Sequence, residues 1–181
     1  MNSLTKLLLL SAICIAVITF TAELAFAATD ATDATCAIDC TVAGQLEWSD
    51  NFTAISIVEE LTEQNDQITG SGTTTLWTNG NVTLTTAGAA IAQLVADPED
   101  FLVTEYQLEY DGDGVTATGG STVAYALHSA FITGAGSAVT HFSTDGAVVL
   151  TLTVRASHDT DNVANADDYT ATQTITATWN P

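Results

Sequence analysis

Oxygen-bearing side chains are concentrated in one short stretch near the C-terminus, which is the best candidate for metal chemistry. Ca²⁺ binds clustered carboxylate and carbonyl oxygens, so a loop of this composition predicts a calcium site. The alternative is a solvated acidic loop, because an excess of carboxylates does not by itself build a coordination shell. The six candidate ligands are Asp159, Asp161, Asn162, Asn165, Asp167 and Asp168.

The second candidate is a pair of cysteines, Cys36 and Cys40. Apolar and polar residues alternate from position 36 to 48, which is typical of a half-buried strand and puts both thiols on one face. Residues four apart in a strand are about 13 Å apart, whereas a disulfide needs Cα atoms within about 7 Å. Two interpretations stay open: a small-loop disulfide, with the strand starting near Thr41, or two thiols unpaired in the monomer that could bridge to another chain. An oxidising compartment favours the disulfide.

No catalytic motif accompanies the histidines. His128, His141 and His158 could act as bases or ligands, but the chain has no GxSxG elbow, no HExxH helix and no signature that joins a nucleophile to a base. We therefore expect no enzyme activity, and no cofactor other than calcium.

The three tryptophans raise the question of glycan binding. Trp48, Trp77 and Trp179 occupy the apolar phase of strand-like segments, which predicts that they lie in the core or at sheet ends. The alternative is a platform that stacks on sugars. The sequons at Asn51 and Asn81 matter only in a host that glycosylates.

The N-terminus has the layout of an export signal. Lys6 precedes an apolar run from Leu7 to Phe20, and Ala25-Phe26-Ala27 follows as a cleavage-type site. We expect a signal peptide over 1–27, a flexible leader over 28–35 and one domain over 36–181. The mature protein would then be secreted or held at the cell surface, with no membrane insertion.

The charge balance excludes two classes of partner. The 181 residues carry a formal net charge of −20, and Arg155 is the only Lys or Arg beyond the expected signal peptide. Such a surface repels nucleic acid and anionic membranes. The excess favours solubility in a salty medium, which screens repulsion beyond about 8 to 10 Å, over the alternative of divalent cation binding.

Alternation with a period of two recurs along the domain and predicts an all-β fold. Leu76, Val82 and Leu84 alternate with threonines around Asn79-Gly80, a strong hairpin signal. Further strand signals are the run 101–110 before an Asp-Gly-Asp-Gly turn, the segment 115–126, the alternating segment 148–156, and the closing segment 169–179, one face of which is entirely threonine.

Only residues 87–96 have a helical composition, and Asp97-Pro98 would end that helix. Seven or more short strands separated by turns favour an antiparallel β-sandwich over a barrel. The predicted fold is therefore an antiparallel β-sandwich with one short helix.

Four segments carry a family resemblance. They are CTVAGQLEW, GTTTLWTNGNVTLTTAG, TVAYALHS and the closing GAVVLTLTV with DDYTATQTITATW. In this order they resemble secreted bacterial pilin-like domains of the spore-coat-U and fimbrial type, although the second cysteine usual near Leu76 or Trp77 is missing. The resemblance implies an incomplete immunoglobulin-like sandwich that polymerises by strand exchange between subunits.

The expected function is that of a structural or adhesive surface protein, the subunit of an extracellular filament or matrix that self-assembles by β-strand complementation. The alternative is a secreted module that binds carbohydrate or calcium.

Overall fold

The computed structural model describes residues 36–97, 100–161 and 163–180. The chain divides into two compact units, Met1–Thr41 and Val42–Pro181. Of the first unit, only residues 36–41 are described. The expected signal peptide and leader lie outside the described residues and stay predictions.

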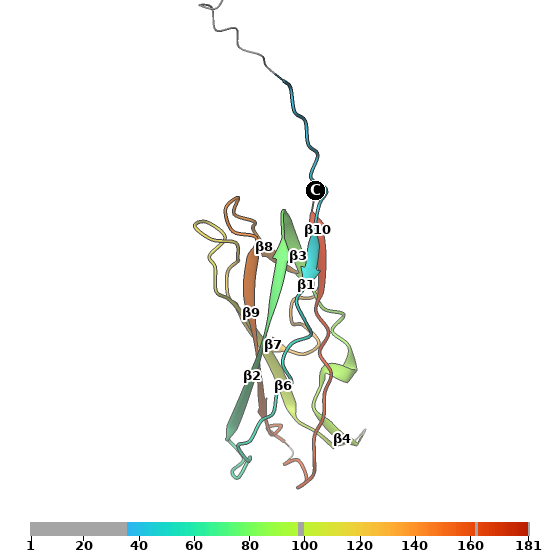
Figure 1. Cartoon of the computed structure of the whole chain (residues 1–181). Coiled ribbons are helices and arrows are strands. Elements are labelled where there is room, and N and C mark those ends of the chain that lie inside the picture. The colour runs from blue at the N-terminus through green and yellow to red at the C-terminus, as the bar shows by residue number, and fades with distance from the viewer. Residues whose placement is uncertain (1–35, 98–99, 162, 181) are drawn as a thin grey trace, which may run out of the picture. The chain divides into compact units, whose positions relative to one another are not determined.

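The second unit is built on a five-stranded antiparallel sheet in the order β1-β2-β9-β6-β7 (Figure 1). Its centre is β9, which pairs with β2 on one side and with β6 on the other. The strands are β1 (Leu46–Trp48), β2 (Gln67–Thr78), β6 (Val103–Tyr110), β7 (Val123–Leu127) and β9 (Ala147–Ser157).

A second, three-stranded sheet has the order β10-β3-β8, and a small two-stranded sheet joins β4 to β5. All pairs are antiparallel, so the expected all-β, sandwich-like fold is confirmed. The bounds are β3 (Asn81–Thr85), β8 (Ser137–Val139), β10 (Thr176–Asn180), β4 (Val95–Asp97) and β5 (Asp100–Phe101).

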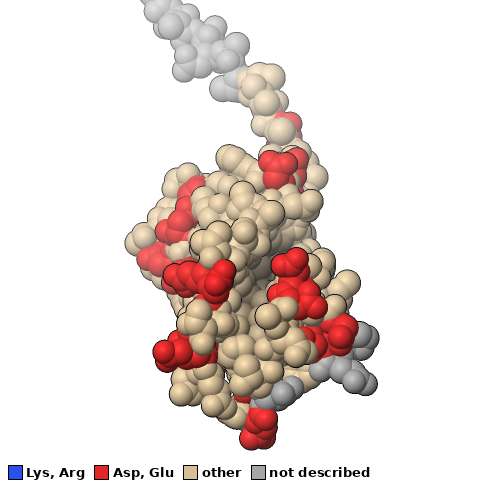
Figure 2. Space-filling view, turned by 90° about the horizontal axis from the view of Figure 1, so that it is seen from below, with Lys and Arg blue, Asp and Glu red and all other residues tan. Residues whose placement is uncertain are grey.

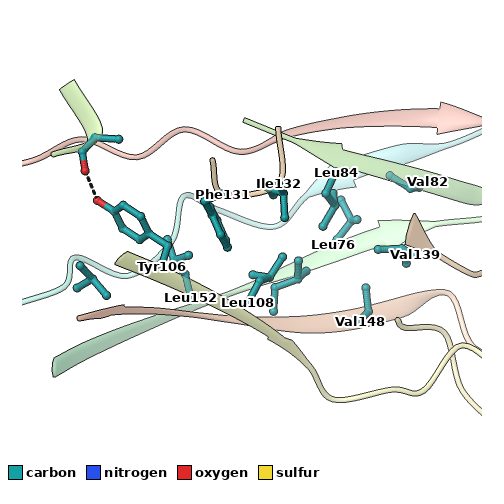
Figure 3. Close-up of a cluster of buried hydrophobic side chains, with 13 residues drawn as sticks. Leu76, Val82, Leu84, Tyr106, Leu108, Phe131, Ile132, Val139, Val148 and Leu152 are labelled. Carbon is teal, nitrogen blue, oxygen red and sulfur yellow. Dashed lines mark hydrogen bonds between the residues drawn. The ribbon is translucent and has the colours of Figure 1, made fainter. Parts of the chain in front are cut away.

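The core lies between the two main sheets and follows the alternation of β9. Val148, Leu150 and Leu152 are buried, whereas the residues between them lie on the opposite face. Buried side chains of β2, β3 and β6 complete this layer (Figure 3). Tyr106 packs its ring against Phe131, with 5.6 Å between centroids, and its hydroxyl donates a hydrogen bond to the carbonyl of Ala92 at 2.7 Å.

The predicted hairpin at Asn79-Gly80 is wrong. Both strands and the tight turn exist, but β2 pairs with β1 and β9, whereas β3 pairs with β10 and β8. The turn therefore carries the chain from one sheet to the other. The side-chain amide of Asn79 holds this turn in place: its Oδ1 accepts the N–H of Gln45, and its Nδ2 donates to the carbonyl of Ala43.

The predicted helix over 87–96 is also wrong. The described residues there form a three-residue 3₁₀ turn, η1 (Ala90–Ala92), and then enter β4. The backbone is extended from Gln93 onward, and the N–H of the next residue, Leu94, donates to the buried hydroxyl of Thr104 at 2.9 Å. Tertiary pairing thus overrides an alanine-rich helical preference.

Strand patterns at the two ends of the domain are longer than the strands themselves. The alternation from position 36 predicts a half-buried strand, yet β1 starts at Leu46, and Ile38 and Val42 are 87% and 75% exposed. The alternation from 169 predicts a strand, yet paired strand begins only at Thr176. In the same region the threonines at 170–178 are exposed, as expected of a solvated face.

Candidate functional site

A groove opens in the second layer, below the three-stranded sheet. One wall is the segment 52–64, the other is the segment 163–173, and Tyr106, Leu152 and Val154 from the large sheet contribute to the floor. Its volume of about 1110 Å³ exceeds the roughly 300–1,000 Å³ of a small-molecule pocket. Figure 1 shows the second wall (red) continuing into β10. The groove thus borders the chain segment that leads into β10, an edge strand of the three-stranded sheet.

Two glycines let the first wall lie directly on the large sheet. Gly70 and Gly72 occupy inward positions of β2. A Cβ at Gly70 would come within 2.8 Å of Ile55 Cγ2, and a Cβ at Gly72 would collide with the carbonyl oxygen of Thr53. Ile55 and Ile57 consequently pack against the core from above, while Val58, which also lines the groove, stays 87% exposed.

The groove exposes unpaired main chain on both sides. Thr170 exchanges two backbone hydrogen bonds with Val95, and the N–H of Thr172 donates to Ile91. Because alternate residues of an extended chain direct their polar groups to opposite edges, Ala171 and Gln173 direct theirs toward the groove. Among the described residues, no backbone hydrogen bond joins residues 54–61 to another segment. Both walls therefore have the unpaired N–H and C=O groups of open sheet edges.

Asp100 fixes the second wall in place. This carboxylate is 6% exposed and accepts hydrogen bonds from the Tyr169 hydroxyl at 2.8 Å and from the Asn165 side chain at 3.0 Å. The bond from Tyr169 is the main reason why the pKa of Asp100 is lowered. Burial, followed by the bond to Asp100, raises the pKa of Tyr169 to about 12. Sequence reasoning missed Asp100, since no local motif links it to a loop 65 residues later.

The rim of the groove is acidic. Among its lining residues are Glu59, Glu60, Glu63, Asp167 and Asp168. Viewed from below, the surface carries acidic side chains around a central recess, and no described Lys or Arg is in view (Figure 2). Arg155 is on the opposite face of β9 from Val154, where it bonds to Glu105 at 2.6 Å. The groove thus combines walls of mixed polar and apolar side chains with a negative rim.

The described members of the predicted calcium set do not form a coordination shell. Asp159 Oδ1 accepts the N–H of Asp161, and Asn165 turns to Asp100; Asn162 lies outside the described residues. Within the described part of the chain, no group of three or more His, Cys, Asp or Glu side chains could hold a metal ion. The calcium site stays a prediction. Instead, Asp167 and Asp168 belong to the groove wall.

The predicted cysteine site consists of two free thiols. Cys36 and Cys40 are both exposed and unpaired in the structure. All residues from 36 to 44 are exposed and outside regular secondary structure. The two thiols share the apolar positions of the segment with Ile38 and Val42, so this part of the chain carries apolar side chains that are exposed among the described residues.

The histidines and tryptophans do not converge on one site. His158 Nδ1 accepts the N–H of Ala164 beside the groove, whereas His141 lies 3.5 Å from the hydroxyl of Thr118. Trp48 and Trp179 pack against the core, as predicted, but Trp77 is 53% exposed. Of these three tryptophans, Trp77 alone is exposed enough to stack on a sugar ring.

No family model matches the chain, and no curated protein matches it. In the described portion of the chain, no helix is long and apolar enough to cross a membrane.

Proposed function

We propose that this protein is an exported structural subunit that assembles into an extracellular filament or matrix by β-strand complementation. The observation that carries the proposal is the groove, whose two walls lie outside the paired strands, have main-chain groups without a backbone partner among the described residues, and stand over an apolar floor. An extended peptide that enters such a groove gains main-chain hydrogen bonds at both edges, and its alternate side chains enter the apolar interior. The volume of the groove also favours a peptide segment over a small ligand.

The donor is the segment 36–42 of another copy. Cys36, Ile38, Cys40 and Val42 alternate on one face, and Ala37, Asp39 and Thr41 on the other. This is the pattern of a strand with one buried face. Ile38 and Val42 are 87% and 75% exposed in the isolated chain, so almost all of their apolar surface is free to be buried by a partner.

Chain length makes the exchange intermolecular. A Cβ at Gly44 would come within 2.8 Å of the Trp179 ring, so the segment leaves the domain beside the end of β10. The nearest groove residue on that wall is Gln173, six positions and roughly 20 Å of extended chain away from Trp179. The two steps from Gly44 to Val42 span at most about 7 Å. Val42 therefore cannot reach the groove of its own subunit, so insertion of the whole segment 36–42 requires another copy, and donation along a row of copies yields a polymer.

A mixing experiment tests the proposal. Ile38→Asp places a charge on the inserted face and removes donation, whereas Ala171→Pro removes an N–H that faces the groove and blocks acceptance. Each purified variant alone is expected to stay monomeric in analytical ultracentrifugation. Mixed in equal amounts, they should form dimers and nothing longer, because one variant keeps its groove and the other keeps its donor.

The matched control is Ala171→Ser, which keeps the N–H and should polymerise like the unchanged protein. Thermal unfolding of each variant verifies that the domain is intact. Polymerisation of Ile38→Asp alone, or failure of the mixture to form dimers while the unchanged protein assembles, would overturn the proposed donor and acceptor.

A further inference from the structure

We propose that a disulfide between Cys36 and Cys40 withdraws the donor segment, so that strand donation is restricted to the dithiol form of the protein. The inference rests on the proposed function, because it concerns the same segment and the same groove. It starts from a geometric conflict between two states of five consecutive residues.

The extended segment and the disulfide exclude each other. In a strand, Cys36 and Cys40 have Cα atoms about 13 Å apart. A disulfide requires about 4.4–6.8 Å. Closing the bond must therefore fold residues 36–40 into a tight loop, and this displaces Ile38 from the face that it shares with Val42. The looped form can neither pair along both groove edges nor present its apolar side chains in alternation.

Both thiols are open to reagents in the free subunit. Cys36 and Cys40 are exposed and unpaired. A low-molecular-weight disulfide is a sufficient oxidant: the thiolate of one cysteine attacks it, its S–S bond breaks, and one reagent thiol leaves. The second cysteine then attacks the mixed disulfide and releases the other reagent thiol. The protein loses two protons and two electrons, the reagent is reduced to two thiols, and an excess of a dithiol reverses the reaction.

Insertion and oxidation compete for the same residues. In the inserted segment, Cys36 and Cys40 face the groove with Ile38, so the assembled subunit shields both thiols from reagents. A subunit that assembles first is protected, and a subunit that is oxidised first stays unassembled. The cysteines thus act as a redox switch on assembly. They do not form disulfides that link the subunits of the filament.

The experiment compares the purified exported protein under reducing conditions and after treatment with oxidised glutathione. Mass spectrometry checks that the oxidised monomer has lost two hydrogens, and ultracentrifugation measures assembly. We expect the reduced protein to polymerise and the oxidised protein to assemble at least ~30-fold more weakly, which corresponds to losing the Ile38 contact. Addition of dithiothreitol should restore assembly.

The matched control is the double variant Cys36→Ala/Cys40→Ala, which keeps an apolar face and should assemble equally with and without oxidant. Iodoacetamide should also label the cysteines of reduced polymers more slowly than those of monomers. Equal assembly of the oxidised and reduced protein, or oxidation to disulfide-linked dimers in place of an internal bond, would overturn the switch and leave the proposed function intact. Failure of both the reduced protein and the double variant to assemble would overturn the proposed function itself.

Discussion

Replacement of Ile38 by alanine is expected to weaken self-association without destabilising the subunit. The side chain is 87% exposed in the isolated chain, so its removal costs the folded domain almost no packing. The substitution deletes three carbon atoms. At about 0.8 kcal/mol for each buried CH₂ group, and scaled by the exposed fraction, the donor loses about 2 kcal/mol of binding free energy. This corresponds to a dissociation constant ~30-fold higher.

Sedimentation equilibrium over a concentration series measures that constant, and urea unfolding verifies that stability is unchanged. Ile91→Ala is the matched control, because Ile91 is 65% exposed, is not among the groove-lining residues and loses the same three carbons. We expect Ile91→Ala to leave the dissociation constant where it was. A change of less than about threefold for Ile38→Ala would refute the assignment of this residue to the buried face of the donor, since it would leave less than ~0.7 kcal/mol for the contact.

Three further predictions address charge, packing and ionisation. The groove rim and the donor segment are both acidic, so they repel each other at low salt. Raising the salt concentration from about 0.1 M to 1 M shortens the screening length from about 10 Å to 3 Å. Light scattering should therefore show stronger assembly at high salt. Tyr106→Phe leaves the carbonyl of Ala92 without its buried donor and should cost about 1–3 kcal/mol in urea unfolding, whereas Tyr125→Phe should cost little. Backbone N–H groups, chiefly that of Thr116, lower the pKa of Asp113 to about 2. The stability that this carboxylate contributes is therefore fully present above its unfolded pKa of about 3.9 and is lost as the pH falls through about 2. An NMR titration midpoint of Asp113 near the unfolded value would contradict this prediction.

The faces of strands could be predicted from the sequence, but their partners could not. The alternation from Val148 to Ala156 gives the buried face of β9 correctly, because burial on one side dictates a period of two. The same alternation at Leu76 and Val82 fits a hairpin equally well, yet the two strands belong to different sheets. Each strand only requires an apolar surface opposite its inner face, and that surface is set by segments far away in the chain.

The groove was not predictable for a related reason. The closing segment has one uniform alternation, but only its second half finds a neighbour in β3, whereas the half that includes Ala171 borders open space. Gly70 and Gly72, alternating within β2, were the available signal, because glycine in a strand marks the close approach of another backbone. These glycines can be interpreted only when the segment that packs on them is known, and no local sequence pattern identifies that segment.

The most direct test of strand complementation is a cryo-electron microscopy reconstruction of polymers formed by the reduced, exported protein. We predict density for residues 36–42 of one copy between the walls 53–61 and 167–173 of the next, with Ile38 pointing to the large sheet and the N–H of Ala171 paired to the inserted chain. An empty groove in an ordered polymer, or a groove filled by another segment, would contradict this account.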